Sequence, residues 1–470
     1  MSIISGRFLL FFILFFLLWH FLPGKSRPAL LLAGSLLFYL SAGPFAFSLL
    51  LCVILWSYLG GHLLAKKKSR GTYLLFFAGL LLLLLALKIR NMATGAPLPV
   101  GASFYILTAA GYLTAVYRQK IEYEKGFLYY APFVSFFPSL LSGPIGQADV
   151  LLPQLHRAVG TEAVPEEDLL YRGFYRFLWG MFIKLFVANR LAPAVGYIFD
   201  AAGYYSGLYH LFAAFLFSVQ LYADFSAYSD MAIGLAMMLH IRLPENFRNP
   251  FLSVSLKELW TRWHISLNRW LADNLYIPLG GNRLGETRTV CNLLIVFFFS
   301  GLWHGEGVHF IVWGLYNALL MLIGMWTEPF RAAIRKKCGL DTKAWYRWVR
   351  RGIVFFLFSM AFIFFRADSV AGGLFMTRGI LSIRPQELIG FYPQQLFDKS
   401  NASFLFSMGM IGVFFAVQYL RSREDLLFQK IRNTPRAAQI LFSAVLVILL
   451  VFAACADLTT LNTQFIYSKF

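Results

Sequence analysis

Residues 28–65 read PALLLAGSLLFYLSAGPFAFSLLLCVILWSYLGGHLLA and contain no charged side chain. A membrane-spanning helix needs roughly 20 apolar residues, so this stretch is long enough for two helices. Glycine and proline are the strongest local interruptions of regular structure, and we therefore place a hinge near Gly43-Pro44. The stretch predicts a pair of helices in a membrane.

Further uncharged stretches recur along the 470 residues of the chain. They are residues 8–24, 71–87, 91–117, 126–148, 201–223, 289–305, 307–327, 352–365, 401–420 and 437–456. The alternation of a transmembrane β-barrel is not present. We predict an all-α, polytopic membrane protein with about 10 to 12 transmembrane or re-entrant helices.

The composition excludes several other classes. The chain is 59% apolar and 14% charged, yet its net charge is +19. A soluble enzyme or a nucleic-acid-binding protein carries more charge on its surface, so we expect membrane lipids and no nucleic acid as partners. The four cysteines are scattered, without a CxxC pair or a Cys/His ligand spacing, and we expect no metal site.

The positions of the charges predict the orientation. Basic clusters at residues 66–70, 331–351 and 421–436 read as cytoplasmic by the positive-inside rule. The loop 366–400 and the tail 457–470 then lie outside. We treat the chain as one integral membrane domain, with N-terminal helices in 1–125, a core in 126–330, C-terminal helices in 331–456 and the extracytoplasmic tail.

His304 is the foremost candidate for chemistry. It lies at the turn of a predicted hairpin whose flanks look cytoplasmic. The first leg, 290–303, is roughly 21 Å long as a helix, which is short of the roughly 30 Å hydrocarbon core and predicts that His304 lies within the membrane. A neutral imidazole there can act as a general base on a hydroxyl. The alternative is a structural histidine hydrogen-bonded to a helix end.

Other polar groups also need an explanation. His264, on a predicted interfacial helix, shares a face with Trp260 and Asn268, and the simpler interpretation is a packing histidine. Asp224 and Tyr228 are i,i+4 neighbours followed by Asp230. The acids there mark an ion or proton path, or else pair with arginine or cap a helix break. The aromatic tail at residues 465–470 is expected to dock into a groove.

Several of these residues belong to longer motifs. The motifs are PVGASFY at 99–105, FPSLLSGPI at 137–145, DFSAYSDMAIG at 224–234, PENF at 244–247, WTRWHIS at 260–266, LYIPLGGNR at 275–283 and GLWHG at 301–305. In this order they resemble the membrane-bound O-acyltransferase (MBOAT) family. The resemblance is greatest to the branch of alginate O-acetyltransferase membrane subunits, and the teichoic-acid D-alanyl transfer proteins are related. Ala227 departs from the glycine that is usual in the third motif.

The resemblance implies a fold and a set of site residues. It implies a helical bundle around a central tunnel, with His304 as the catalytic histidine and His264 as the second characteristic one. The motif-supporting positions are Asp224, Ser226, Tyr228, Asp230, Trp263, Ser266, Asn268 and Trp303. The tail FIYSKF resembles the terminus of this branch, and Tyr467 is then the expected acyl acceptor.

The resemblance also implies a reaction and its setting. An acyl group, expected to be acetyl from acetyl-CoA with no bound cofactor, passes from the cytoplasmic side of a bacterial cytoplasmic membrane toward an extracytoplasmic polysaccharide. An SGNH-type extracytoplasmic acyltransferase is the expected partner. The alternatives within the enzyme class are a teichoic-acid-type D-alanyl transferase and a lipid-directed acyltransferase. Outside that class, broken helices and buried acids also suit a secondary transporter.

Overall fold

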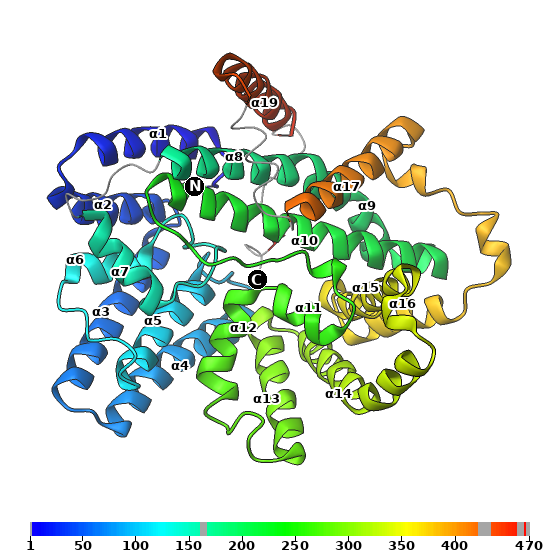
Figure 1. The fold of residues 1–470 in the computed structure, drawn as a ribbon, viewed down its shortest axis with the longest axis horizontal. Coiled ribbons are helices and arrows are strands. Elements are labelled where there is room, and N and C mark those ends of the chain that lie inside the picture. The colour runs from blue at the N-terminus through cyan, green and yellow to red at the C-terminus, as the bar shows by residue number, and fades with distance from the viewer. Residues whose placement is uncertain (1, 160–166, 422–433, 458–464, 467–470) are drawn as a thin grey trace. The chain divides into compact units, whose positions relative to one another are not determined.

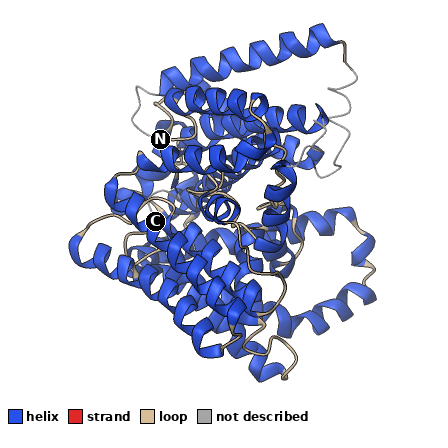
Figure 2. Cartoon of the chain, turned by 90° about the vertical axis from the view of Figure 1, so that its left-hand side faces the viewer, coloured by secondary structure: helices blue, strands red, loops and turns tan. Residues whose placement is uncertain are grey.

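The computed structural model describes residues 2–159, 167–421, 434–457 and 465–466. Within these ranges every regular element is helical, as the blue ribbons of Figure 2 show. These residues include 7 helices that are long and apolar enough to cross a membrane. They are Pro44–Lys66, Arg70–Thr94, Asp168–Asp200, Gly207–Met238, Val308–Lys337, Ala344–Arg366 and Asn401–Leu420. The prediction of an all-α, multi-pass membrane protein is confirmed.

The contacts of the chain cluster in two compact units. The first comprises Met1–Phe182, Phe225–Glu245 and Ser443–Phe470, and the second comprises Ile183–Asp224 and Asn246–Phe442. Two long helical runs leave one unit and enter the other, at Phe182–Ile183 and at Asp224–Phe225.

The first unit is built mainly from the N-terminal helices. Its elements are α1 (Gly6–Phe21), η1 (Gly24–Ser26), α2 (Arg27–Leu40), α3 (Pro44–Lys66), α4 (Arg70–Thr94), α5 (Ala102–Tyr117), α6 (Phe127–Ser135), α7 (Ala148–Val159) and most of α8 (Glu167–Ile183). Helices α3, α4 and α5 pack against one another. The predicted hinge is confirmed, because α2 ends at Leu40 and α3 begins at Pro44 after Gly43 with φ 99°. That φ lies in the region that only glycine adopts without strain.

The second unit carries the middle of the sequence. Its elements are η2 (Lys184–Ala188), α9 (Asn189–Asp200), η3 (Ala202–Tyr204), η4 (Pro250–Leu252), α11 (Leu256–Arg262), α12 (Ile265–Leu271), η5 (Ala272–Tyr276), α13 (Glu286–His304), α14 (Val308–Lys337), η6 (Leu340–Thr342), α15 (Ala344–Arg366), α16 (Val370–Leu381), η7 (Pro385–Leu388), η8 (Pro393–Leu396) and α17 (Asn401–Arg421). Helices α10 (Gly207–Met238) and α19 (Arg436–Asp457) contribute to both units.

One long apolar run was absent from the sequence-based prediction. Helix α8, the π-helical turn η2 and α9 form a single run over Asp168–Asp200. The prediction relied on stretches without any charged residue, and this run was missed because it contains Arg176 and Lys184. Both cations are compensated within the fold. Arg176 donates to Asp230 over 2.8 Å, and Lys184 donates to Asp224 over 2.6 Å.

Residues 126–148 do not form the continuous helix that their lack of charge predicted. Helix α6 ends at Ser135, and α7 begins only at Ala148. The segment between them contains Pro138 and Pro144, and proline removes a helical hydrogen bond and clashes with the preceding turn. The span predicted at 126–148 is therefore wrong.

Candidate active site

His304 is the last residue of α13 and is buried. Gly305 follows it, and α14 begins at Val308, so the predicted hairpin turn is confirmed. A Cβ at Gly305 would lie 2.0 Å from the ring of Phe310. A side chain after His304 would therefore displace the buried ring of Phe310.

The length expected for the first leg of this hairpin is wrong. Helix α13 begins at Glu286, after Gly285 with φ 89°, and has 19 residues. It is about 28 Å long at 1.5 Å per residue, which is close to the hydrocarbon thickness. Its polar first turn is stabilised by the Thr289 hydroxyl, which donates to the carbonyl of Gly285 over 2.9 Å. Helix length alone therefore does not set the depth of His304.

Helices α13 and α14 cross closely, and Figure 1 shows them side by side. A Cβ at Gly301 would lie 2.5 Å from the carbonyl oxygen of Phe310, and one at Gly314 would lie 2.3 Å from that of Phe297. Only residues without a side chain allow the two backbones to approach this far. The crossing places Trp313, next to Gly314 in the sequence, beside His304, with 4.9 Å between the ring centroids.

His264 does not lie within a helix as the pattern of tryptophans predicted. It separates α11 from α12, with φ 44° in the left-handed region. Such a backbone is uncommon for a residue other than glycine. Neighbouring groups hold it in place: the Ile265 amide donates to the Asn246 carbonyl over 2.9 Å, and the Ser266 hydroxyl donates to Asn246 Oδ1 over 2.6 Å.

Two of the other predicted residues support this break. The side-chain amide of Asn268 donates from Nδ2 to the backbone carbonyls of Trp260 and Trp263, each over 2.6 Å. Trp263 itself is buried and packs against Phe358, with 5.1 Å between centroids. Asn268 therefore closes the end of α11, and Trp263 anchors that end in the aromatic core of the second unit.

The two histidines come together although they are 40 positions apart in the sequence (304 minus 264). Their ring centroids are 6.4 Å apart, and Trp303 contacts both rings, at 5.7 Å from His264 and 4.7 Å from His304. Phe365, from the end of α15, contacts His304 at 5.4 Å. The site is thus a buried pair of imidazoles within a ring of aromatic side chains.

Trp313 and Phe365 were not among the predicted site residues. The hairpin itself contained a signal for Trp313, because a close return of the chain after His304 brings the first turns of the second leg alongside the end of the first. Phe365 carries no comparable signal, since its contact with His304 depends on how α15 packs.

Burial determines the charge of His264, which lies outside the candidate membrane spans. It lowers the pKa of His264 from 6.5 to about 3, because a charged imidazolium is poorly solvated in an apolar interior. At neutral pH His264 is therefore a neutral imidazole, which can donate one hydrogen bond and accept another.

Asp224 is held in a buried ion pair in the second unit. Its carboxylate accepts a hydrogen bond from Lys184 over 2.6 Å, and each side chain is only 2% exposed. Pairing with arginine was one of the interpretations that the sequence left open for the acids of this motif, and the partner of Asp224 is instead a lysine.

The remaining motif residues lie in the first unit. Asp230 accepts a hydrogen bond from Arg176 over 2.8 Å, and the same guanidinium donates to Glu245 over 2.6 Å. Ser226 and Tyr228 are buried in the same unit. Arg176 thus connects α8 both to α10 and to the segment that follows it.

The beginning of the C-terminal tail packs against this unit. Phe465 is buried and meets Tyr228 edge to face, with 5.0 Å between the ring centroids. Tyr467 lies outside the described residues, two positions beyond Phe465. The start of the aromatic tail is therefore anchored on α10.

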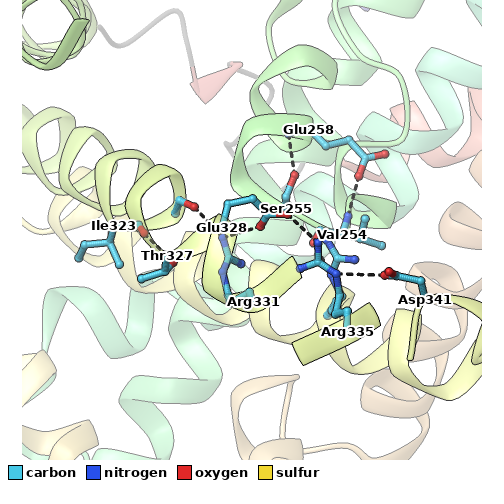
Figure 3. A network of polar contacts seen from close by, with 11 residues as sticks. Val254, Ser255, Glu258, Ile323, Thr327, Glu328, Arg331, Arg335 and Asp341 are labelled. Carbon is cyan, nitrogen blue, oxygen red and sulfur yellow. Dashed lines mark hydrogen bonds and ion pairs between the residues drawn. The ribbon is translucent and has the colours of Figure 1, made fainter. Parts of the chain in front are cut away.

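Polar contacts organise the basic end of α14, shown in Figure 3. Arg335 is largely buried and donates to Glu328 over 2.6 Å and to Asp341 over 3.0 Å. Arg350 donates to the carbonyl of Val254, just before α11, over 3.0 Å. Among the described residues, no group of three His, Cys, Asp or Glu side chains is arranged to hold a metal ion.

Comparisons with known proteins give the context of this site. The model of the family described as "MBOAT, membrane-bound O-acyltransferase family" matches residues 117–366. A probable alginate O-acetylase AlgI of Pseudomonas putida is 32% identical over 465 residues, which cover 94% of this chain and 91% of the relative. A peptidoglycan O-acetyltransferase of Helicobacter pylori is 34% identical over 61% of this chain and 57% of the relative. A teichoic acid D-alanyltransferase of Bacillus subtilis is 30% identical over 40% of this chain and 49% of the relative.

Proposed function

Because the chain belongs to the membrane-bound O-acyltransferase family, we propose that it transfers an acetyl group from a cytoplasmic thioester toward an extracytoplasmic polysaccharide, with His304 as the catalytic base. It is an O-acyltransferase and a multi-pass membrane protein. The observation that carries the proposal is the buried pair of His264 and His304, which lies within the matched residues 117–366. The names of the relatives support O-acetylation of a surface polymer.

The proposed chemistry is a transfer between a thioester and a hydroxyl. His304 accepts the hydroxyl proton while the oxygen attacks the thioester carbonyl. The new C–O bond forms, the C–S bond breaks, and the proton passes to the leaving thiolate. General-base assistance contributes typically 10² to 10⁴-fold. The aromatic enclosure excludes water, which strengthens electrostatic interactions within the site. His264, neutral at physiological pH, orients the thioester.

The donor is proposed to be acetyl-CoA, which enters from the basic face of the protein. Cations favour the phosphates of such a donor and also the anionic headgroups of lipids. Arg331, near the end of α14, is a partly exposed cation of this face: its side chain is 41% exposed, and it pairs with Glu328 over 3.0 Å. Arg335 is more buried and is paired with both Glu328 and Asp341.

Tyr467 is proposed as the acyl relay on the outside of a bacterial cytoplasmic membrane. A phenol, with a pKa of about 10, is a better leaving group than an alkanol, so its ester is readily passed on. The burial of Phe465 against Tyr228 supports a docked tail. The relay would then transfer the group to an SGNH-type extracytoplasmic partner, which acylates the polysaccharide.

The decisive experiment replaces His304 by alanine in cells that carry the acceptor polymer. Loss of surface O-acetylation with a normal amount of protein in the membrane is the expected result. His62→Ala, a histidine of α3 in the first unit, is the matched control and should retain acetylation. Retained acetylation in His304→Ala would reject the catalytic role. Mass spectrometry of the C-terminal peptide tests the relay, which predicts an acetyl ester on Tyr467 that is lost in Tyr467→Phe.

A D-alanyl transfer is the second candidate, because a teichoic acid D-alanyltransferase is 30% identical over 196 residues. The same mass spectrometry distinguishes the two, since an ester-linked D-alanyl group adds an amine and an acetyl group does not.

A further inference from the structure

We infer that Trp313 and Phe365 form a wall that restricts the acyl group beside His304 to a short chain. This inference rests on the proposed function, because it takes His304 as the group next to the reacting carbonyl. It assigns substrate selection to two residues that no motif identified.

Three aromatic rings cover the sides of His304. Trp303, Trp313 and Phe365 have their centroids 4.7, 4.9 and 5.4 Å from the imidazole, all edge to face. Aromatic rings in contact have centroids about 4.5 to 7 Å apart, so these distances leave no layer of carbon atoms between the rings. A long acyl chain therefore has no path past these three side chains.

The side that faces His264 is the wider one, with 6.4 Å between the ring centroids. The two rings are tilted by 53°, and their separation is still within the range of aromatic contact. An acyl group beside His304 therefore enters by displacing the His264 ring, which is the most loosely packed of the four neighbours. Each added methylene group then requires a further displacement of packed side chains.

The two side chains of the wall, Trp313 and Phe365, have little room to move away from His304. Trp313 and Phe365 are 1% and 2% exposed and contact each other, with centroids 5.2 Å apart. Trp313 is fixed by the close crossing at Gly314. Phe365 follows Phe364, whose carbonyl accepts a hydrogen bond from His309 Nδ1 over 2.9 Å. Packed interiors of this kind resist expansion, so the limit on chain length is built into the fold.

The test measures thiol release from acetyl-, propionyl-, butyryl- and hexanoyl-CoA by the full-length protein in membranes. In the wild type we expect about a tenfold fall or more for each added methylene, the effect of one misfitting methylene group in a tight pocket. Trp313→Phe and Phe365→Leu should raise the butyryl-to-acetyl ratio at least about tenfold. Both variants keep an apolar side chain, so they preserve folding better than truncation to alanine.

Phe356→Leu is the matched control, because Phe356 lies on α15 together with Phe365 but is 41% exposed. It should leave the ratio unchanged. An unchanged ratio in Trp313→Phe and in Phe365→Leu, with acetyl transfer intact, would overturn the wall while leaving the proposed function standing. Equal use of hexanoyl- and acetyl-CoA by the wild type would overturn it as well. Absence of thiol release from every donor would reject the proposed function and the wall together.

Discussion

Removing the carboxylate of Asp224 is expected to destabilise the protein more than any surface substitution. Asp224 and Lys184 are 2.6 Å apart, and each side chain is 2% exposed. In Asp224→Asn the buried ammonium of Lys184 loses the negative charge of this pair. Breaking a buried ion pair in this way costs about 3 to 5 kcal/mol, which is a factor of about 10² to 10³·⁵ in the folding equilibrium.

Two comparisons make the prediction specific. Asp200→Asn removes an ion pair with Arg366 whose carboxylate side chain is 63% exposed, and such surface pairs contribute at most about 1 kcal/mol. The double variant Lys184→Met/Asp224→Leu replaces both charges by apolar groups of similar size. It should recover most of the lost stability, because no uncompensated charge remains in the interior.

The assay is unfolding of the purified protein in detergent, followed by circular dichroism as sodium dodecyl sulfate is added. We expect the order of stability to be wild type, Asp200→Asn, the double variant, and then Asp224→Asn. A loss in Asp224→Asn no larger than in Asp200→Asn would refute the reasoning. So would a double variant as unstable as the single one.

Three further predictions concern the site and the tail. Burial of His264 should make the free energy of unfolding rise with pH between about 3 and 6.5, by up to about 1.4 kcal/mol per pH unit. The reason is that the unfolded chain, in which this histidine is protonated, binds more protons in that range than the folded one. In His264→Gln the free energy of unfolding, measured by acid unfolding, should depend less steeply on pH. Asn246→Ala removes the acceptor of the buried Ser266 hydroxyl and should cost about 1 to 3 kcal/mol, measured by thermal unfolding, and lower acyl transfer. Phe465→Ala should reduce the ester on the C-terminal peptide, because it removes the buried ring that packs against Tyr228; an unchanged amount of ester, measured by mass spectrometry, would contradict docking.

Much of the architecture follows from the absence of charge. The hinge at Gly43-Pro44 and the helices at 352–365 and 401–420 were predictable, because glycine, proline and hydropathy act locally. The run over 168–200 was not, since a count of single charges cannot show that Arg176 and Lys184 find carboxylates on another helix. Buried pairs are a tertiary property.

The site shows the same division. The Gly305 that follows His304 indicated the end of a helix, and the structure places His304 there. His264 looked helical because no glycine or proline interrupts residues 256–271. Its left-handed backbone depends on Asn246, which lies 18 positions earlier in the sequence (264 minus 246) and pairs with Ile265 and Ser266. Sequence patterns report periodicity, whereas this break is imposed by a distant segment.

The π-helical turn at Lys184–Ala188 has a consequence for the register of the run from Asp168 to Asp200. A π-turn accommodates one residue more than an α-helical turn, and one residue corresponds to about 100° of rotation at 3.6 residues per turn. The sequence spacing of residues on one face therefore shifts by one position between α8 and α9. Deleting one residue there would close the turn to α-helix and leave the side chains of α9 on the faces that they occupy now, whereas the same deletion elsewhere in the run would rotate them.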